Sequence, residues 1–115
     1  MGSNNKTLIL PLKKKWYDMI ESGEKTEEYR EIKKYWCKRL SYCEMYECCN
    51  SPCWYGSMLH LMNPQGYTHV RFRYGYTKRT MLFELKSITK GKGKEEWGAP
   101  NKDVFILKLG ERIYE

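Results

Sequence analysis

The chain has no long apolar run: none approaches the roughly 20 residues of a membrane-spanning helix. Its first residues, MGSNNK, are polar and lack the apolar stretch of a secretory signal. The sequence therefore predicts no membrane partner and a cytoplasmic location. We expect residues 1–6 to be disordered or vector-derived, and residues 7–113 to form one domain, because 115 residues suit a single core.

Lysine and arginine are absent from residues 41–68, although the whole chain has a formal net charge of +7. Residues 69–94 hold eight basic residues and one acidic residue, so the positive excess is concentrated in one segment. A localised basic excess is typical of a protein that binds a polyanion such as nucleic acid. The alternative is a lysine-rich face that contacts only solvent.

The five cysteines lack the spacing of a disulfide framework and of paired C-x2-C zinc motifs. All lie between Cys37 and Cys53, and their odd number favours a reducing compartment. We interpret them as small apolar side chains in an inserted loop. A zinc site completed by His60 or His69 is the alternative, but the sequence predicts neither a metal nor a cofactor.

Apolar periodicity predicts an α+β domain with a curved, mainly antiparallel sheet or small barrel. Trp16, Met19 and Ile20 fall on one face of a helix. Gly23 then stands where a helix C′ residue is expected. The predicted elements are strands 7–12, 25–32, 69–77, 79–89 and 103–113, and helices 13–22 and 33–40.

Residues 41–68 fit neither a helical nor a strand period. We expect a long, mostly irregular insertion that ends in a turn at Asn63–Gly66. A loop of this length inside a compact domain indicates either a functional segment or a misassigned element. Residues 91–100 are shorter and read as a turn-rich connection before the last strand.

The stretch GEKTEEYR, residues 23–30, places five charged side chains between two apolar segments. On a strand, Glu28 and Arg30 share one face, and Lys25 lies on the opposite face unless the turn at Gly23 rotates it towards Glu28. The ammonium of Lys25 and the guanidinium of Arg30 suit a phosphate or a base edge. The alternative is a structural ion pair, of Glu28 with Arg30 or Lys25, that braces the helix against the barrel.

A second basic segment, HVRFRYGYT, alternates in the manner of a strand. Arg71 and Arg73 face one way, and Tyr74 and Tyr76 lie close by in the sequence. Aromatic faces stack on unpaired bases while arginines contact phosphates, so this cluster suits single-stranded nucleic acid. The alternative is that Tyr74 belongs to the core and the arginines form an ordinary polar face.

Four positions of GEKTEEYR fill the pattern G-x-K-x-x-E-x-R: Gly23, Lys25, Glu28 and Arg30. Together with the preceding ESG, the later FRYGY and EEWG, and the order of the elements, this pattern resembles the ASCH domain family of the PUA-like superfamily. The resemblance covers residues 7–40 and 69–113. It leaves out 41–68, which looks like an insertion.

The resemblance implies a PUA-like β-barrel of about five or six mainly antiparallel strands with two or more short helices. The motif would line a cleft that binds RNA or a modified nucleoside, with DNA as an alternative ligand. Trp16 and Trp97 are interpreted as core or cleft-wall packing residues rather than stacking platforms. The expected ligand-binding residues are Lys13, Lys25, Glu28, Arg30, Arg71, Arg73 and Tyr76.

Hydrolysis is the alternative function. One branch of the family that the chain resembles removes the acetyl group from N4-acetylcytidine, and Lys25 and Glu28 would be the catalytic residues of an enzyme acting on RNA or on such a base. The nucleophilic threonine of that branch falls on Glu28, and Thr26 stands two positions too early. Glu28 would then act as a general base on water. A second alternative is a protein-interaction domain that binds its partner through 41–68.

Overall fold

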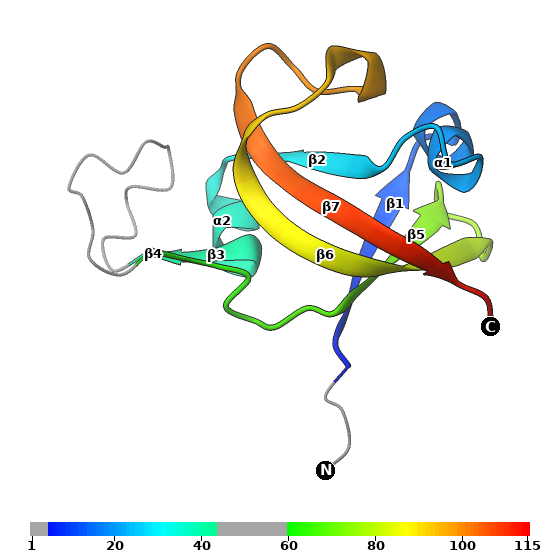
Figure 1. The fold of residues 1–115 in the computed structure, drawn as a ribbon, viewed down its shortest axis with the longest axis horizontal. Helices are drawn as coiled ribbons and strands as arrows, with labels where there is room; N and C mark the ends of the chain where they lie inside the picture. Colours follow the sequence, from blue (N-terminus) through cyan, green and yellow to red (C-terminus); the bar gives the residue numbers. More distant parts are fainter. Residues whose placement is uncertain (1–4, 44–59) are drawn as a thin grey trace.

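The computed structural model describes residues 5–43 and 60–115, which form a compact α+β fold with a five-stranded sheet curled into a half-barrel (Figure 1). The predicted α+β class is confirmed. No helix in the described ranges is long and apolar enough to cross a membrane. The elements, in chain order, are β1 (Thr7–Leu12), α1 (Lys14–Glu21), β2 (Glu27–Glu31), α2 (Lys34–Leu40), β3 (Ser41–Cys43), β4 (His60–Met62), β5 (His69–Tyr74), β6 (Thr80–Lys92), η2 (Glu95–Trp97) and β7 (Asp103–Ile113).

The main sheet is mixed, with the strand order β1-β5-β6-β7-β2. β1 runs parallel to β5, and the other three pairings are antiparallel. Curling brings the two edge strands together at one point, where Nη2 of Arg30 on β2 donates a hydrogen bond of 3.3 Å to the carbonyl oxygen of Pro11 on β1. A side chain rather than a backbone ladder therefore joins β1 to β2.

The long strand β6 gives the sheet its curvature (Figure 1). Its pairing with β7 shifts register twice, between Phe83 and Leu85 and between Leu85 and Ser87. Such bulges bend a strand and increase its twist. β6 continues to Lys92, beyond its predicted end, and this continuation shortens the turn-rich connection expected at 91–100.

The core lies between the concave face of the sheet and the two helices. The predicted apolar face of α1 is confirmed at Ile20, which is buried, but the second buried residue is Tyr17, while Trp16 and Met19 are half-buried. The reason is a tertiary contact, because the Tyr17 ring packs edge-on against Tyr74 of β5 with 5.1 Å between centroids. The core side chains are Leu8, Leu10, Leu12, Tyr17, Ile20, Cys37, Leu40, Val70, Phe72, Met81, Phe83, Leu85, Ile88, Phe105, Leu107 and Leu109.

The segment 41–68, predicted to be mostly irregular, contains two short strands. β3 pairs antiparallel with β4 in a separate two-stranded sheet. Each of these strands has three residues, too few to show a period in the sequence. The predicted turn is confirmed, with a hydrogen bond of 3.1 Å from the backbone N–H of Gly66 to the carbonyl oxygen of Asn63. Residues 44–59, and residues 1–4 of the expected disordered leader, lie outside the described residues.

The connection from β6 to β7 folds back against the start of α1 through Gly98. This residue ends η2 with a φ of +100°, a backbone conformation that favours glycine. A Cβ atom at Gly98 would also lie 2.9 Å from Cζ2 of Trp16. The missing side chain therefore lets the Trp16 indole pack directly on the backbone of the connection.

We expect Gly98→Ala to lower the free energy of unfolding by about 1–3 kcal/mol, because alanine is strained at this φ and also meets the Trp16 ring. Gly23→Ala is the matched control, since Gly23 has a φ of +86° and no atom within 4 Å of its missing Cβ. Urea denaturation of both variants measures the difference. Equal losses would show that the Trp16 contact contributes nothing.

Candidate functional site

A cleft of about 300 Å³ opens where the end of β1 and the start of α1 meet β2 and η2. This volume is at the lower end of the range of small-molecule sites, ~300–1,000 Å³. The wall combines charged, aromatic and backbone groups from segments that are far apart in the sequence. The lining residues are Pro11, Leu12, Lys13, Trp16, Lys25, Glu28, Tyr29, Arg30, Trp97 and Gly98.

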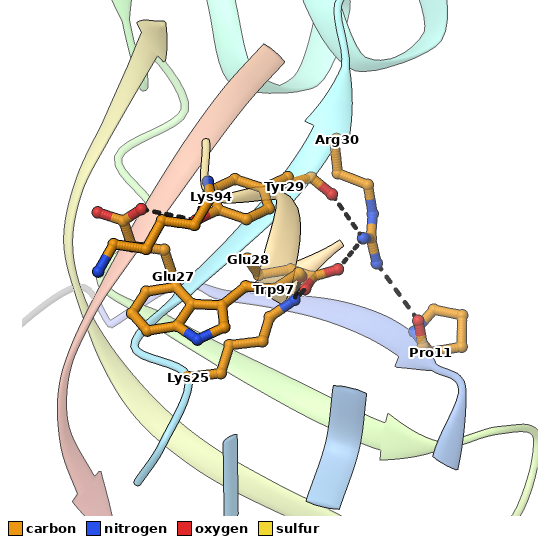
Figure 2. A network of polar contacts seen from close by, with 8 residues as sticks. All are labelled: Pro11, Lys25, Glu27, Glu28, Tyr29, Arg30, Lys94 and Trp97. Atoms are coloured by element: carbon orange, nitrogen blue, oxygen red, sulfur yellow. Dashed lines mark hydrogen bonds and ion pairs between the residues drawn. The ribbon is translucent and has the colours of Figure 1, made fainter. Parts of the chain in front are cut away.

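Lys25 and Glu28 meet at the bottom of this cleft (Figure 2). β2 begins at Glu27, so Lys25 precedes the strand, and its backbone N–H donates to the carbonyl oxygen of Met19 at 3.0 Å. Nζ of Lys25 lies 2.8 Å from Oε1 of Glu28. Strand alternation would put these two side chains on opposite faces, but it does not apply before Glu27, so the alternative that Lys25 is rotated towards Glu28 is the one observed.

Arg30 holds the other oxygen of the Glu28 carboxylate (Figure 2). Its Nη1 contacts Oε2 of Glu28 and donates a hydrogen bond of 2.9 Å to the carbonyl oxygen of Tyr29. The predicted placement of Glu28 and Arg30 on one strand face is confirmed. The carboxylate thus lies between two cations, and the same guanidinium reaches Pro11 across the closure of the sheet.

Both members of the Lys25–Glu28 pair are buried, with 2% and 4% of the residue exposed. Nζ of Lys25 also donates to the carbonyl oxygen of Trp97 and lies 4.7 Å from the Trp16 ring centroid. Burial lowers the pKa of Lys25, and the neighbouring carboxylate of Glu28 opposes this shift. A lysine with a lowered pKa beside a carboxylate in a cleft is typical of functional sites, although structural ion networks share the feature.

One polar atom at the bottom of the cleft is incompletely satisfied. Oε1 of Glu28 is buried and, within the described residues, has no partner in hydrogen-bonding geometry. The Lys25 ammonium at 2.8 Å supplies a counter-charge for this oxygen. A carboxylate oxygen can accept more than one hydrogen bond, so the atom retains capacity for a donor brought by a ligand.

Two half-buried tryptophans contribute to the aromatic part of the wall, one from α1 and one from η2. Nζ of Lys15 lies 4.8 Å from the Trp16 ring centroid, and Nζ of Lys94 lies 4.2 Å from that of Trp97. The interpretation of Trp16 and Trp97 as cleft-wall residues agrees with their position. The sequence indicated a role for Trp97 through its place in EEWG, one of the stretches that resemble the ASCH family.

Tyr29 is a lining residue that the sequence reasoning missed, because the strand period turns it away from Glu28. Its hydroxyl donates to Oε1 of Glu27 at 2.8 Å and accepts from the backbone N–H of Lys94 at 3.0 Å. Burial is the main cause that raises the pKa of Tyr29 to about 12, and the hydrogen bond to Glu27 adds to the shift. Tyr29 is therefore a neutral phenol at physiological pH.

The seven predicted ligand-binding residues do not all line the cleft. Lys13, Lys25, Glu28 and Arg30 do. Of the other three, Arg71 makes a two-pronged ion pair with Glu115 at 2.7 and 2.9 Å. Arg73 lies opposite Pro11 in the pairing of β5 with β1, and Tyr76 lies in the turn that follows β5.

A comparison of the chain with protein-family models, curated proteins and solved structures finds no match. The resemblance to the ASCH family therefore stays a prediction that rests on its motif residues.

We expect Glu28→Gln to lower the free energy of unfolding by about 3–5 kcal/mol, because it leaves the buried ammonium of Lys25 without its counter-charge. The double variant Lys25→Met/Glu28→Gln should lose less than the two single losses added together. Urea denaturation measures all three variants, and additivity within about 0.5 kcal/mol would contradict the coupling. Glu31→Gln on the same strand removes an exposed carboxylate and should change stability little.

The raised pKa of Tyr29 also predicts how stability depends on pH. The folded state holds the phenol proton more tightly than the unfolded chain, so this contribution is fully present below the usual tyrosine pKa near 10 and is lost as the pH rises through about 12. An alkaline absorbance titration of the wild type minus that of Tyr29→Phe isolates the group. We expect a difference midpoint near 12, and a midpoint near 10 would contradict the burial argument. Circular dichroism at each pH checks that the fold persists.

Proposed function

We propose that this protein binds RNA or a modified nucleoside in the cleft, with one nucleotide unit held between Lys13, the tryptophans and the buried ion network. The single observation that carries the proposal is the Glu28 carboxylate. It is buried in an open cleft between two cations, with Nζ of Lys25 2.8 Å from one oxygen and Arg30 on the other. Three charged side chains in a cleft wall cost desolvation energy that a purely structural wall would avoid.

The charge of the wall favours an anionic ligand. Lys13, Lys25 and Arg30 contribute three positive charges against one carboxylate. Lys13 is exposed, and its side chain makes no hydrogen bond or ion pair with the described residues, so it is available to a phosphate. Phosphate contacts of this kind supply most of the affinity of nucleic-acid binding proteins.

The remaining groups suit a base. Glutamate accepts hydrogen bonds from exocyclic amino groups such as N4 of cytosine. The indole rings of Trp16 and Trp97 supply an apolar wall against which the base can pack. We therefore expect a base with an exocyclic amine to be preferred over uracil. The motif supports the wider proposal of an ASCH-type, PUA-like domain, because Lys25, Glu28 and Arg30 converge in a cleft as the resemblance implies.

A hydrolase is the second candidate function. The lowered pKa of Lys25 beside Glu28 favours it, because such a pair can move a proton. The composition of the wall weighs against covalent catalysis: its lining residues include no serine, threonine or cysteine, and the pKa of Tyr29 is raised to about 12. A reaction here would need water activated by Glu28 or Lys25.

Binding of a labelled single-stranded RNA, followed by fluorescence anisotropy at several salt concentrations, tests the proposal. We expect affinity to fall with salt, and Lys13→Ala to reduce the slope of log K against log salt by about 0.7 for one lost phosphate contact. Lys86→Ala, which removes an exposed lysine from β6 outside the cleft, is the matched control and should leave the slope unchanged. The Lys25→Met/Glu28→Gln variant should lose most of the affinity.

Free cytidine, N4-acetylcytidine and uridine, titrated by tryptophan fluorescence, test recognition of the base. The DNA version of the same oligonucleotide tests whether the protein distinguishes ribose from deoxyribose. Chromatography of N4-acetylcytidine and RNA after incubation detects turnover, which would favour the hydrolase. If neither RNA nor nucleoside binds, the nucleotide proposal is wrong, and residues 41–68 become the candidate contact for a protein partner.

A further inference from the structure

We propose that the ligand is a single-stranded RNA rather than a free nucleoside, and that its chain leaves the cleft over Pro11 to a second base-stacking site at Tyr76. This inference rests on the proposed function, because the first nucleotide occupies the cleft. It assigns a role to the turn between β5 and β6, which the cleft itself does not include.

The β5–β6 turn begins at the wall of the cleft. Because β1 runs parallel to β5, Pro11 lies opposite Arg73 and Leu12 opposite Tyr74. Neighbouring strands are only about 4.8 Å apart. The first residue of the turn is tied to the same wall, since the backbone N–H of Gly75 donates to the carbonyl oxygen of Leu12 at 2.8 Å. Tyr76 therefore directly follows Gly75, which is hydrogen-bonded to the cleft-lining residue Leu12.

The turn is held in place from its base. The Tyr74 ring packs edge-on against the buried Tyr17, and the backbone N–H of Tyr74 donates to the carbonyl oxygen of Arg79 at 2.9 Å. Both the N–H and the hydroxyl of Thr77 donate to the carbonyl oxygen of Tyr74. A turn closed in this way presents Tyr76 on an ordered support, which lowers the entropy that binding has to overcome.

The side chain of Tyr76 does not contribute to the packing of the fold. It is 91% exposed and makes no ring or hydrogen-bond contact with the described residues. An accessible tyrosine ring on a basic surface is the platform on which proteins stack unpaired bases. Its neighbourhood favours nucleic acid over an uncharged ligand.

The cations along the path divide into paired and unpaired groups. Arg79 is held by Glu21, at 2.9 Å and 3.1 Å from its two oxygens. The side chains of Lys13, Arg73 and Lys78, by contrast, form no hydrogen bond or ion pair within residues 5–43 and 60–115. Lys13 lines the cleft, Arg73 lies opposite the cleft-lining Pro11, and Lys78 is in the turn of Tyr76, so the phosphates of an RNA chain would give these cations partners that a free nucleoside lacks.

The two subsites are separated by comparing each nucleoside 5′-monophosphate with an oligonucleotide of the same base. The oligonucleotides are oligo-rA, oligo-rC and oligo-rU of about six nucleotides, a length in the lower part of the usual range of single-strand site sizes. The measured quantity is the affinity advantage of each oligonucleotide over its own monophosphate. We expect Tyr76→Ala to shrink this advantage by about 5- to 100-fold, the effect of one lost stacking contact. Tyr76→Phe keeps the ring face and should retain the advantage.

Tyr114→Ala is the matched control, because Tyr114 is also largely exposed, at 79%, but follows β7 at the end of the chain. If Tyr76→Ala and Tyr114→Ala reduce the affinity advantage of the oligonucleotide equally, or if neither variant reduces it, Tyr76 is not a second stacking site. The cleft proposal survives that result if Lys25→Met/Glu28→Gln still abolishes monophosphate binding. If the wild type binds no monophosphate and no oligonucleotide, the proposed function fails, and this inference fails with it.

Discussion

The buried carboxylate of Glu28 is the group on which both the closure of the sheet and the cleft depend. A charge removed from water needs compensation, and Glu28 receives it from Lys25 at 2.8 Å and from Arg30 on its other oxygen. Each cation is in turn tied to a different part of the fold. Lys25 reaches the carbonyl oxygen of Trp97 in the β6–β7 connection, and Arg30 reaches that of Pro11 on β1. One anion thereby holds three segments that do not pair with one another.

This arrangement explains why there is a cleft at all. Had β1 and β2 formed a backbone ladder, their edges would have closed about 4.8 Å apart and left no room between them. They are instead the two outer strands of the sheet and meet through a guanidinium. The start of α1 and the β6–β7 connection then cover the gap, with Trp16 packed on the backbone at Gly98. The same side-chain contact thus links the two edges of the half-barrel and leaves a polar opening beside it.

The sequence predicted features set by local periodicity and missed those set by tertiary contacts. The alternation of β5 and the shared face of Glu28 and Arg30 are properties of single strands, and the structure agrees with them. The orientation of Lys25 depends on where β2 begins, which the charges of GEKTEEYR do not reveal. The buried face of α1 depends on Tyr74, 57 residues after Tyr17 in the chain. The short β3–β4 pair has no local signal because each strand finds its partner across the inserted segment.

Bracing and binding are compatible roles for the same ion network. A buried ion pair often stabilises a fold no better than well-packed apolar residues of the same volume, so bracing alone is a weak reason to place three charged side chains in a cleft. Lys25 already donates to Trp97 and contacts Glu28, which leaves it little capacity for a ligand. The exposed side chain of Lys13, by contrast, makes no hydrogen bond or ion pair with the described residues. Under the proposed function, the network therefore sets the shape and positive potential of the cleft and presents the Glu28 carboxylate to the base, while Lys13 contacts the phosphate.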